Sequence, residues 1–84
     1  MKLLLVEDEP LLLEEMESYL TEQGYRCERA TTFFEGQEKL HLYHYDLVVL
    51  DITIPGGSGL GLLQQFKLDH KNTGVLIVSA KNSL

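Results

Sequence analysis

The sequence predicts an α/β fold in which a doubly wound parallel sheet carries helices on both faces. Short, continuously apolar runs occur at Leu3–Val6, Leu47–Leu50 and Val75–Val78, and such runs are typical of strands covered on both faces of a sheet. Amphipathic segments separate these runs, and an alternation of strands and helices is the pattern of right-handed βαβ units. The 84 residues, 44% of them hydrophobic, make one small domain with room for a single core.

A first helix is expected from Pro10, a residue suited to the first helical position. Its apolar residues recur at helical spacing with glutamates on the other face, and Gly24 can end it because glycine accepts the left-handed conformation. The residues expected to face the core are Leu12, Leu13, Met16, Tyr19 and Leu20. The alternating polarity of Tyr25–Ala30 then predicts a short strand at an edge of the sheet.

A second helix should follow Thr31 or Thr32, either of which can cap it, with Glu35 completing a near capping box. Its expected inner face consists of Phe33, Leu40 and Tyr43. Gly36 weakens this helix by about 0.5–1 kcal/mol relative to alanine. After the central strand, the pattern of Gly59–Leu68 predicts a third helix, which leads to the last apolar strand.

Acidic residues follow two of the apolar strands. Asp51 comes directly after Leu47–Leu50, and Glu7, Asp8 and Glu9 follow the first strand. Asp51 could be a simple capping or loop carboxylate, because loops often begin with aspartate. If the strands are parallel neighbours, however, the carboxylates converge at the edge where open α/β sheets hold ligands. Crowded like charges repel one another unless a hard divalent cation such as Mg²⁺ neutralises them, so the sequence predicts a magnesium site.

Charge and composition argue against several classes of protein. The formal net charge is −6 and the lysines and arginines are scattered, so we expect no nucleic acid to contact this segment. No apolar run approaches the ~20 residues of a membrane span, and the first residues lack the features of a signal peptide. Cys27 is the one cysteine, so no internal disulfide can form. A soluble protein of the reducing cytoplasm is expected.

Three segments together resemble the receiver domains of bacterial two-component response regulators. The first is Val6–Pro10 (VEDEP), the second is Tyr45–Leu60 (YDLVVLDITIPGGSGL), and the third is Ile77–Lys81 (IVSAK). Their order and spacing are typical of the family, and the similarity runs along all 84 residues. The resemblance implies a flavodoxin-like (CheY-like) fold with the sheet order 2-1-3-4 for the four strands that this sequence contains.

The resemblance also implies roles for individual residues. Asp51 corresponds to the phosphoacceptor, which takes a phosphoryl group from a phosphohistidine on a sensor histidine kinase and also binds the metal. Asp8 corresponds to the carboxylate that binds Mg²⁺ directly, and Glu7 to the neighbour that acts largely through a metal-bound water. The backbone carbonyl of Thr53 would be another ligand, and the Ser79 hydroxyl would donate a hydrogen bond to a phosphoryl oxygen. The expected function is Mg-dependent phosphorelay signalling by a chain that is not itself an enzyme.

The family pattern is incomplete in residues 1–84. We expect them to form the N-terminal part of a receiver domain, without the fifth strand, the last helices or an effector domain, which in many relatives binds DNA. Lys81 does not match the family's fifth-strand lysine, because it lies two residues after Ser79. Phosphorylation is therefore expected to be slow or abolished. Val75–Val78 should present an apolar edge, so we expect the chain to dimerise across this edge or by exchange of elements, or else to be marginally folded.

Other functions stay open at this point. Without the lysine, the main alternative is a phosphorylation-incompetent fragment that acts only as an interaction or dimerisation module. Asp51-Ile52-Thr53 faintly resembles the motif of haloacid-dehalogenase-type phosphatases, but Thr53 stands where that motif needs a second aspartate. Gly56–Gly61 lacks the spacing of nucleotide-binding loops. His41 and His44 fit a solvated helix face better than a metal site, because no cysteine or carboxylate cluster accompanies them.

Overall fold

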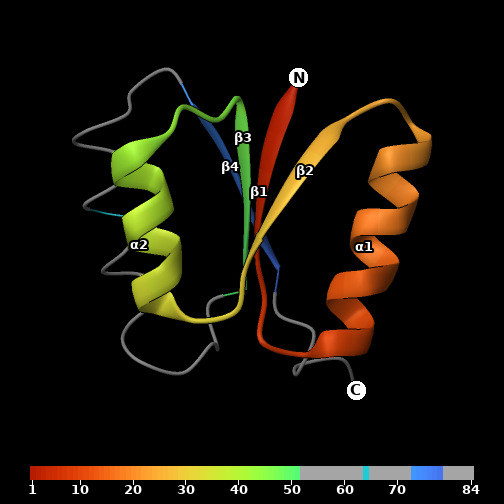
Figure 1. Ribbon diagram of the computed structural model, residues 1–84, viewed down its shortest axis with the longest axis horizontal. Coiled ribbons are helices and arrows are strands. Elements are labelled where there is room, and N and C mark those ends of the chain that lie inside the picture. Colours follow the sequence, from red (N-terminus) through yellow and green to blue (C-terminus); the bar gives the residue numbers. More distant parts are fainter. Residues whose placement is uncertain (52–63, 65–72, 79–84) are drawn as a thin grey trace.

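The computed structural model describes residues 1–51, 64 and 73–78. The elements follow in the order β1 (Lys2–Val6), α1 (Pro10–Glu22), β2 (Arg26–Ala30), α2 (Phe33–Leu42), β3 (Leu47–Asp51) and β4 (Gly74–Val78). Figure 1 shows the sheet nearly edge-on, with α1 on one side of it and α2 on the other. The predicted layers of a doubly wound fold are therefore present.

The four strands form one parallel sheet in the order β2-β1-β3-β4. This order confirms the expected topology, including the edge position of β2, which its alternating polarity predicted. The central strands β1 and β3 lie between the two helical layers, so both of their faces need apolar side chains, as their sequences provide.

The core has one part on each face of the sheet. The buried residues on the α2 face are Leu4, Val6, Ala30, Leu40, Tyr45, Val48 and Leu50. On the α1 face, Leu5, Leu13 and Val49 are buried, and Met16 and Leu20 pack against them. Because successive side chains of a strand point to opposite faces, β1 and β3 contribute to both parts of the core.

Local interactions fix both ends of α1. Pro10 is the first helical residue, and the side chain of Glu9 accepts a hydrogen bond from the Leu11 N–H at 3.1 Å. After the C-cap residue Gln23, Gly24 adopts φ of 94°, in the left-handed region that glycine accepts. The start and the end of α1 are therefore where the sequence predicted them.

Thr32 rather than Thr31 caps α2. The Glu35 N–H donates to Thr32 Oγ1 at 3.1 Å, and Glu35 Oε1 accepts from the Thr31 N–H at 2.6 Å, so the capping interaction uses both threonines. Gly36 is buried against the end of β1, where a Cβ atom would lie 3.4 Å from the side chain of Val6. The second helix thus packs closely on the strand that leads to the acidic residues.

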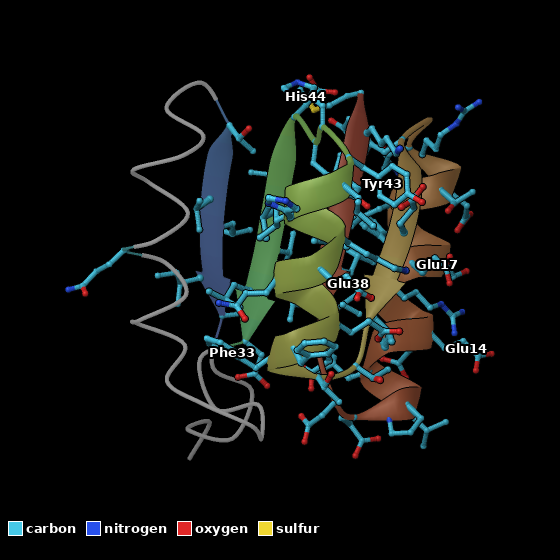
Figure 2. All side chains as sticks on the ribbon, turned by 60° about the vertical axis from the view of Figure 1, so that its left-hand side comes forward. Glu14, Glu17, Phe33, Glu38, Tyr43 and His44 are labelled. Atoms are coloured by element: carbon cyan, nitrogen blue, oxygen red, sulfur yellow. The ribbon has the colours of Figure 1, made fainter. Side chains whose placement is uncertain are left out.

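Two residues that we expected in the core are exposed. Tyr19 is 63% exposed, because it lies at the margin of the apolar face of α1, whereas Leu13 in the middle of that face is 2% exposed. Tyr43 is 50% exposed and is the C-cap of α2 rather than part of its inner face. Figure 2 shows Tyr43 and Phe33 near opposite ends of α2.

Several expectations fall outside the described residues. These are the third helix at Gly59–Leu68 apart from the helical Gln64, the glycine-rich turn at Gly56–Gly61, and Lys81. His41 and His44 are both exposed, as expected of a solvated face. Within the ranges that the structure describes, no helix has the length and apolar character needed to cross a lipid bilayer.

Candidate functional site

The register of the central strands places two acidic residues side by side. β1 and β3 are parallel neighbours, and Val6 at the end of β1 pairs with Leu50 of β3. Each of these residues is followed by a carboxylate, Glu7 after Val6 and Asp51 after Leu50. The carboxylates therefore meet at the carboxyl edge of the sheet, where open α/β sheets bind ligands.

Three carboxylates gather at this edge of the sheet. One carboxylate oxygen from each of Glu7, Asp8 and Asp51 lies within 4.8 Å of the others. Glu7 and Asp51 are both 0% exposed, and Asp8 is half-buried. The Glu9 N–H donates a hydrogen bond to Glu7 Oε2 at 2.9 Å, which orients that carboxylate at the start of the loop before α1.

The crowding of these groups makes ionisation unfavourable. The pKa of Glu7 is raised to about 7, mainly by burial and to a smaller extent by the hydrogen bond with Asp51, the charge of Asp51 and a hydrogen bond with Asp8. The hydrogen bond from the Glu9 N–H acts in the opposite direction. A proton on Glu7 or a bound cation would relieve this unfavourable charge.

The donor set fits a hard divalent cation. All three side chains offer carboxylate oxygens, the ligands that Mg²⁺ prefers, and the described cluster contains neither a thiol nor an imidazole that would favour a softer metal. A cation at this position would neutralise charges that otherwise repel one another in a buried setting. The residues present therefore fit Mg²⁺.

Five residues were predicted to form a site at this edge of the sheet, and the structure describes three of them. Glu7, Asp8 and Asp51 lie together, as predicted from the two apolar strands that precede them. Thr53, whose carbonyl was the expected further ligand, and Ser79, the expected hydroxyl donor, lie outside the described residues.

Sequence reasoning missed a second group of interacting side chains, which is built around the buried Tyr45. The Tyr45 hydroxyl donates a 2.5 Å hydrogen bond to Glu28 Oε1, and Lys2 Nζ lies 3.3 Å from Glu28 Oε2. Lys2 Nζ is also 5.1 Å from the ring centroid of Tyr45 and 5.2 Å from that of Tyr43.

These contacts shift the pKa values of the group. The hydrogen bond from the Tyr45 hydroxyl lowers the pKa of Glu28, with a smaller contribution from Lys2. Burial and then the bond to Glu28 raise the pKa of Tyr45.

Comparison with known protein families matches residues 3–84 to the response regulator receiver domain. The chain belongs to this family. The acidic cluster therefore lies in a receiver domain of the kind found in two-component response regulators. Its four parallel strands with helices on both faces form the corresponding part of a CheY-like fold.

Two similar receiver-containing proteins illustrate how much of a regulator this chain covers. The transcriptional regulatory protein PmrA of Pectobacterium parmentieri is 38% identical over 84 residues, which is 100% of this chain and 38% of PmrA. The two-component response regulator PhoP of Pseudomonas aeruginosa is 37% identical over 83 residues, which is 99% of this chain and 37% of PhoP. The chain thus spans well under half the length of these relatives.

Solved structures of receiver domains agree with the fold. The response regulator TrrA from Thermotoga maritima, solved in complex with Mg²⁺-BeF, aligns with a TM-score of 0.90 and 33% identity over 96% of this chain and 70% of that chain. TrrA in complex with the histidine kinase ThkA aligns with a TM-score of 0.88 and 33% identity, over 98% of this chain and 71% of that chain.

Proposed function

We propose that this receiver domain accepts a phosphoryl group on Asp51 in a Mg²⁺-dependent reaction and thereby transmits a signal from a sensor histidine kinase. The observation that carries the proposal is the cluster of Glu7, Asp8 and Asp51, whose oxygens lie within 4.8 Å of one another at the carboxyl edge of the sheet. The Mg²⁺-BeF complex of TrrA, a receiver 33% identical to this chain, supports the same chemistry.

Each residue of the cluster has a separate task in this proposal. The Asp51 carboxylate would be the nucleophile, and Asp8 and Glu7 would hold the Mg²⁺ that neutralises the phosphoryl oxygens. Phosphoryl transfer passes through a loose transition state, so a positioned nucleophile and a cation beside the phosphoryl oxygens supply most of the catalysis. The Thr53 carbonyl and the Ser79 hydroxyl complete the proposed site. Because the chain is consumed as an acceptor, it acts as a signalling protein rather than as an enzyme.

The proposed kinase surface is the outer face of α1. Leu11 and Tyr19 are 70% and 63% exposed there, and Glu14, Glu15 and Glu22 lie beside them on the same face. Figure 2 shows Glu14 pointing away from the body of the fold. An apolar contact inside an acidic border suits a kinase surface that carries apolar and basic side chains.

The proposed setting of the chain is a cytoplasmic regulator. Relatives such as PmrA are transcriptional regulatory proteins of which this chain spans 38%, so output through DNA belongs to parts of such a protein other than residues 1–84. The net charge of −6 supports the proposal that this segment itself contacts no nucleic acid.

Modification by a small phosphodonor tests the proposal. The chain would be incubated with acetyl phosphate, with and without Mg²⁺, and the modified residue would be located by mass spectrometry. We expect slow, metal-dependent modification of Asp51, since Lys81 does not match the family's fifth-strand lysine. This modification should be lost in Asp51→Asn and retained in Asp46→Asn, a matched change at an exposed aspartate. If the folded chain binds Mg²⁺ but Asp51 stays unmodified, residues 1–84 act as an interaction module instead.

A further inference from the structure

The loop between β1 and α1 joins the acidic cluster to the first helix. Glu7 directly follows β1 and Glu9 is the N-cap of α1, so only Asp8 separates them. The Glu9 N–H donates to Glu7 Oε2 at 2.9 Å, whereas the other oxygen, Glu7 Oε1, is buried and accepts from none of the described N–H groups. The bond from Glu9 therefore fixes one oxygen of the Glu7 carboxylate and leaves the other available to a cation.

The direction of the Glu9 N–H follows from the backbone conformation of Glu9. Its φ of −86° and ψ of 112° are extended, and Pro10 favours this conformation because a proline disfavours the helical region for the residue before it. In a capping box, a glutamate at the third helical position accepts from the N–H of the N-cap residue. Leu12 occupies that position in α1, so the Glu7 carboxylate takes over this role from the strand side.

Two further hydrogen bonds hold Glu9 at the start of α1. Glu9 Oε1 accepts from the Leu11 N–H at 3.1 Å, and the Glu9 carbonyl accepts from the Leu13 N–H at 2.9 Å. Leu13 is buried in the core, and on the strand side the Glu7 N–H donates to the Ala30 carbonyl at 3.0 Å. Both ends of the loop are thus anchored, and the exposed Glu9 side chain is the part that can be changed without altering the core.

We propose that Glu9 is a positioning residue of the acidic site: its side chain caps α1, which keeps its own N–H directed at Glu7 and holds the Glu7 carboxylate in the geometry that binds Mg²⁺. This inference rests on the proposed function, since it concerns the same metal site. Groups that donate hydrogen bonds to metal ligands orient these ligands and strengthen metal binding. Glu9 lies outside the set of three residues whose oxygens gather within 4.8 Å, so it orients a ligand rather than binding the cation itself.

The charge of Glu9 offers a competing explanation, because a negative side chain near the site attracts a cation whatever the orientation of Glu7. Glu9 is exposed, so water and salt screen this attraction. The two effects can be separated, since glutamine keeps an acceptor oxygen for the cap and loses only the charge. Glu9→Gln should therefore bind cations nearly as well as the parent chain, whereas Glu9→Ala should not.

Binding of Mn²⁺, followed by the electron paramagnetic resonance signal of the free ion, tests the role of Glu9. Mn²⁺ prefers the same oxygen ligands as Mg²⁺. We expect the Kd to rise by roughly 3- to 10-fold in Glu9→Ala, less than is usual for loss of a group bonded to a metal ligand, because the N–H of residue 9 remains. Glu9→Gln should stay within about twofold of the parent chain.

Thr32→Ala is the matched control, because Thr32 caps α2 through the same kind of bond, with the Glu35 N–H at 3.1 Å. Both alanine variants lose a helix cap and should lower Tm by about 4–8 °C, but only Glu9→Ala should lose affinity for Mn²⁺. Circular dichroism confirms that each variant is folded at the temperature of the titration. Equal Kd values for the two alanine variants would overturn the inference. So would a Glu9→Gln variant that binds as weakly as Glu9→Ala, since charge would then be responsible.

Hydrogen exchange of the N–H of residue 9, measured by NMR, gives a second readout that needs no metal. This N–H should be protected while it is bonded to Glu7, so the protection should fall in Glu9→Ala and persist in Glu9→Gln. Unchanged protection in Glu9→Ala would show that the side chain does not maintain the bond, which refutes the inference and leaves the proposed phosphoacceptor role intact. A parent chain that binds no Mn²⁺ would instead refute the proposed metal site, and this inference with it.

Discussion

Glu7 and Asp51 are two carboxylates buried side by side, and both are 0% exposed. Burial from water is the main reason why the pKa of Glu7 rises to about 7, and the neighbouring carboxylate of Asp51 adds to it. The stability of the metal-free chain should therefore be limited by this site. A functional site that destabilises the fold in this way is typical of proteins that bind charged ligands.

Asp51→Asn should stabilise the chain in the absence of metal, because the amide removes one of the crowded charges and keeps the shape of the side chain. The expected gain is about 1 kcal/mol or more in the free energy of unfolding, a rise of about 4–8 °C in Tm. Thermal unfolding followed by circular dichroism in EDTA would measure it. Asp46→Asn serves as the control and should leave Tm nearly unchanged; a lower Tm for Asp51→Asn would contradict the electrostatic account of the site.

The Tyr45 hydroxyl should stabilise the folded state in a pH-dependent manner through its bond to Glu28. The pKa of Glu28 is lower in the folded chain than its ordinary value of 4.5, so the stabilisation is complete above this pH and is lost as pH falls below it. Tyr45→Phe should cost about 1–2 kcal/mol at neutral pH, toward the lower value because Glu28 is partly solvated. The difference from the parent chain should shrink below about pH 4.5, as urea unfolding would show.

Tyr43→Phe provides the control for this bond, because Tyr43 is half-exposed at the C-cap of α2 and approaches Lys2 through its ring. A phenylalanine ring keeps most of this contact. The free energy of unfolding should therefore change little. A pH-independent loss in Tyr45→Phe would assign the stability to packing of the ring rather than to the bond with Glu28.

At the scale of single elements, two glycines should respond to alanine in opposite directions. Gly36 is inside α2, where a Cβ would make ordinary contacts of 3.4 Å with Val6, so Gly36→Ala should stabilise by about 0.5–1 kcal/mol, or about 2–8 °C in Tm. Gly24 has φ of 94° with nothing within 4 Å of a Cβ, so Gly24→Ala should destabilise through the backbone alone, by about 1 kcal/mol or more. The comparison of the two melting curves is the test. If both substitutions shift Tm in the same direction, contacts rather than backbone conformation determine the effect of each.

The elements themselves were largely predictable, because each rests on local chemistry. Pro10 with Gly24, and Thr32 with Glu35, fix helix ends through interactions within a few residues, and the structure confirms them. Tyr19 was assigned wrongly because helical periodicity cannot tell the centre of an apolar face from its margin, which depends on what packs against the helix.

At the scale of the whole molecule, the residues that follow the apolar strands made the location of the acidic site predictable from the sequence. Two apolar runs that both end in carboxylates predict that Glu7 and Asp51 meet, since parallel neighbouring strands share an edge, and they do meet. The bond between Tyr45 and Glu28 could not be predicted in this way. The two residues are 17 positions apart, in β2 and in the loop before β3, so only tertiary packing brings them together.

A bound cation should stabilise the molecule as a whole, because the site exists only when β1 and β3 lie side by side. The unfolded chain does not hold three carboxylates together, so Mg²⁺ binds the folded state preferentially and raises the free energy of unfolding. Linkage predicts about 1.4 kcal/mol at ten times the Kd, a rise of several degrees in Tm. Titration of Mg²⁺ during thermal unfolding would measure this rise.

Ionic strength must be separated from specific binding in this titration, because salt also screens the net charge of −6. Sodium chloride at matched ionic strength should give only the screening part of the rise in Tm. Asp51→Asn should keep that part and lose most of the rise specific to Mg²⁺, although its metal-free Tm is higher. If sodium chloride reproduces the whole effect, the three carboxylates do not hold the cation together and the proposed phosphoryl transfer lacks its metal.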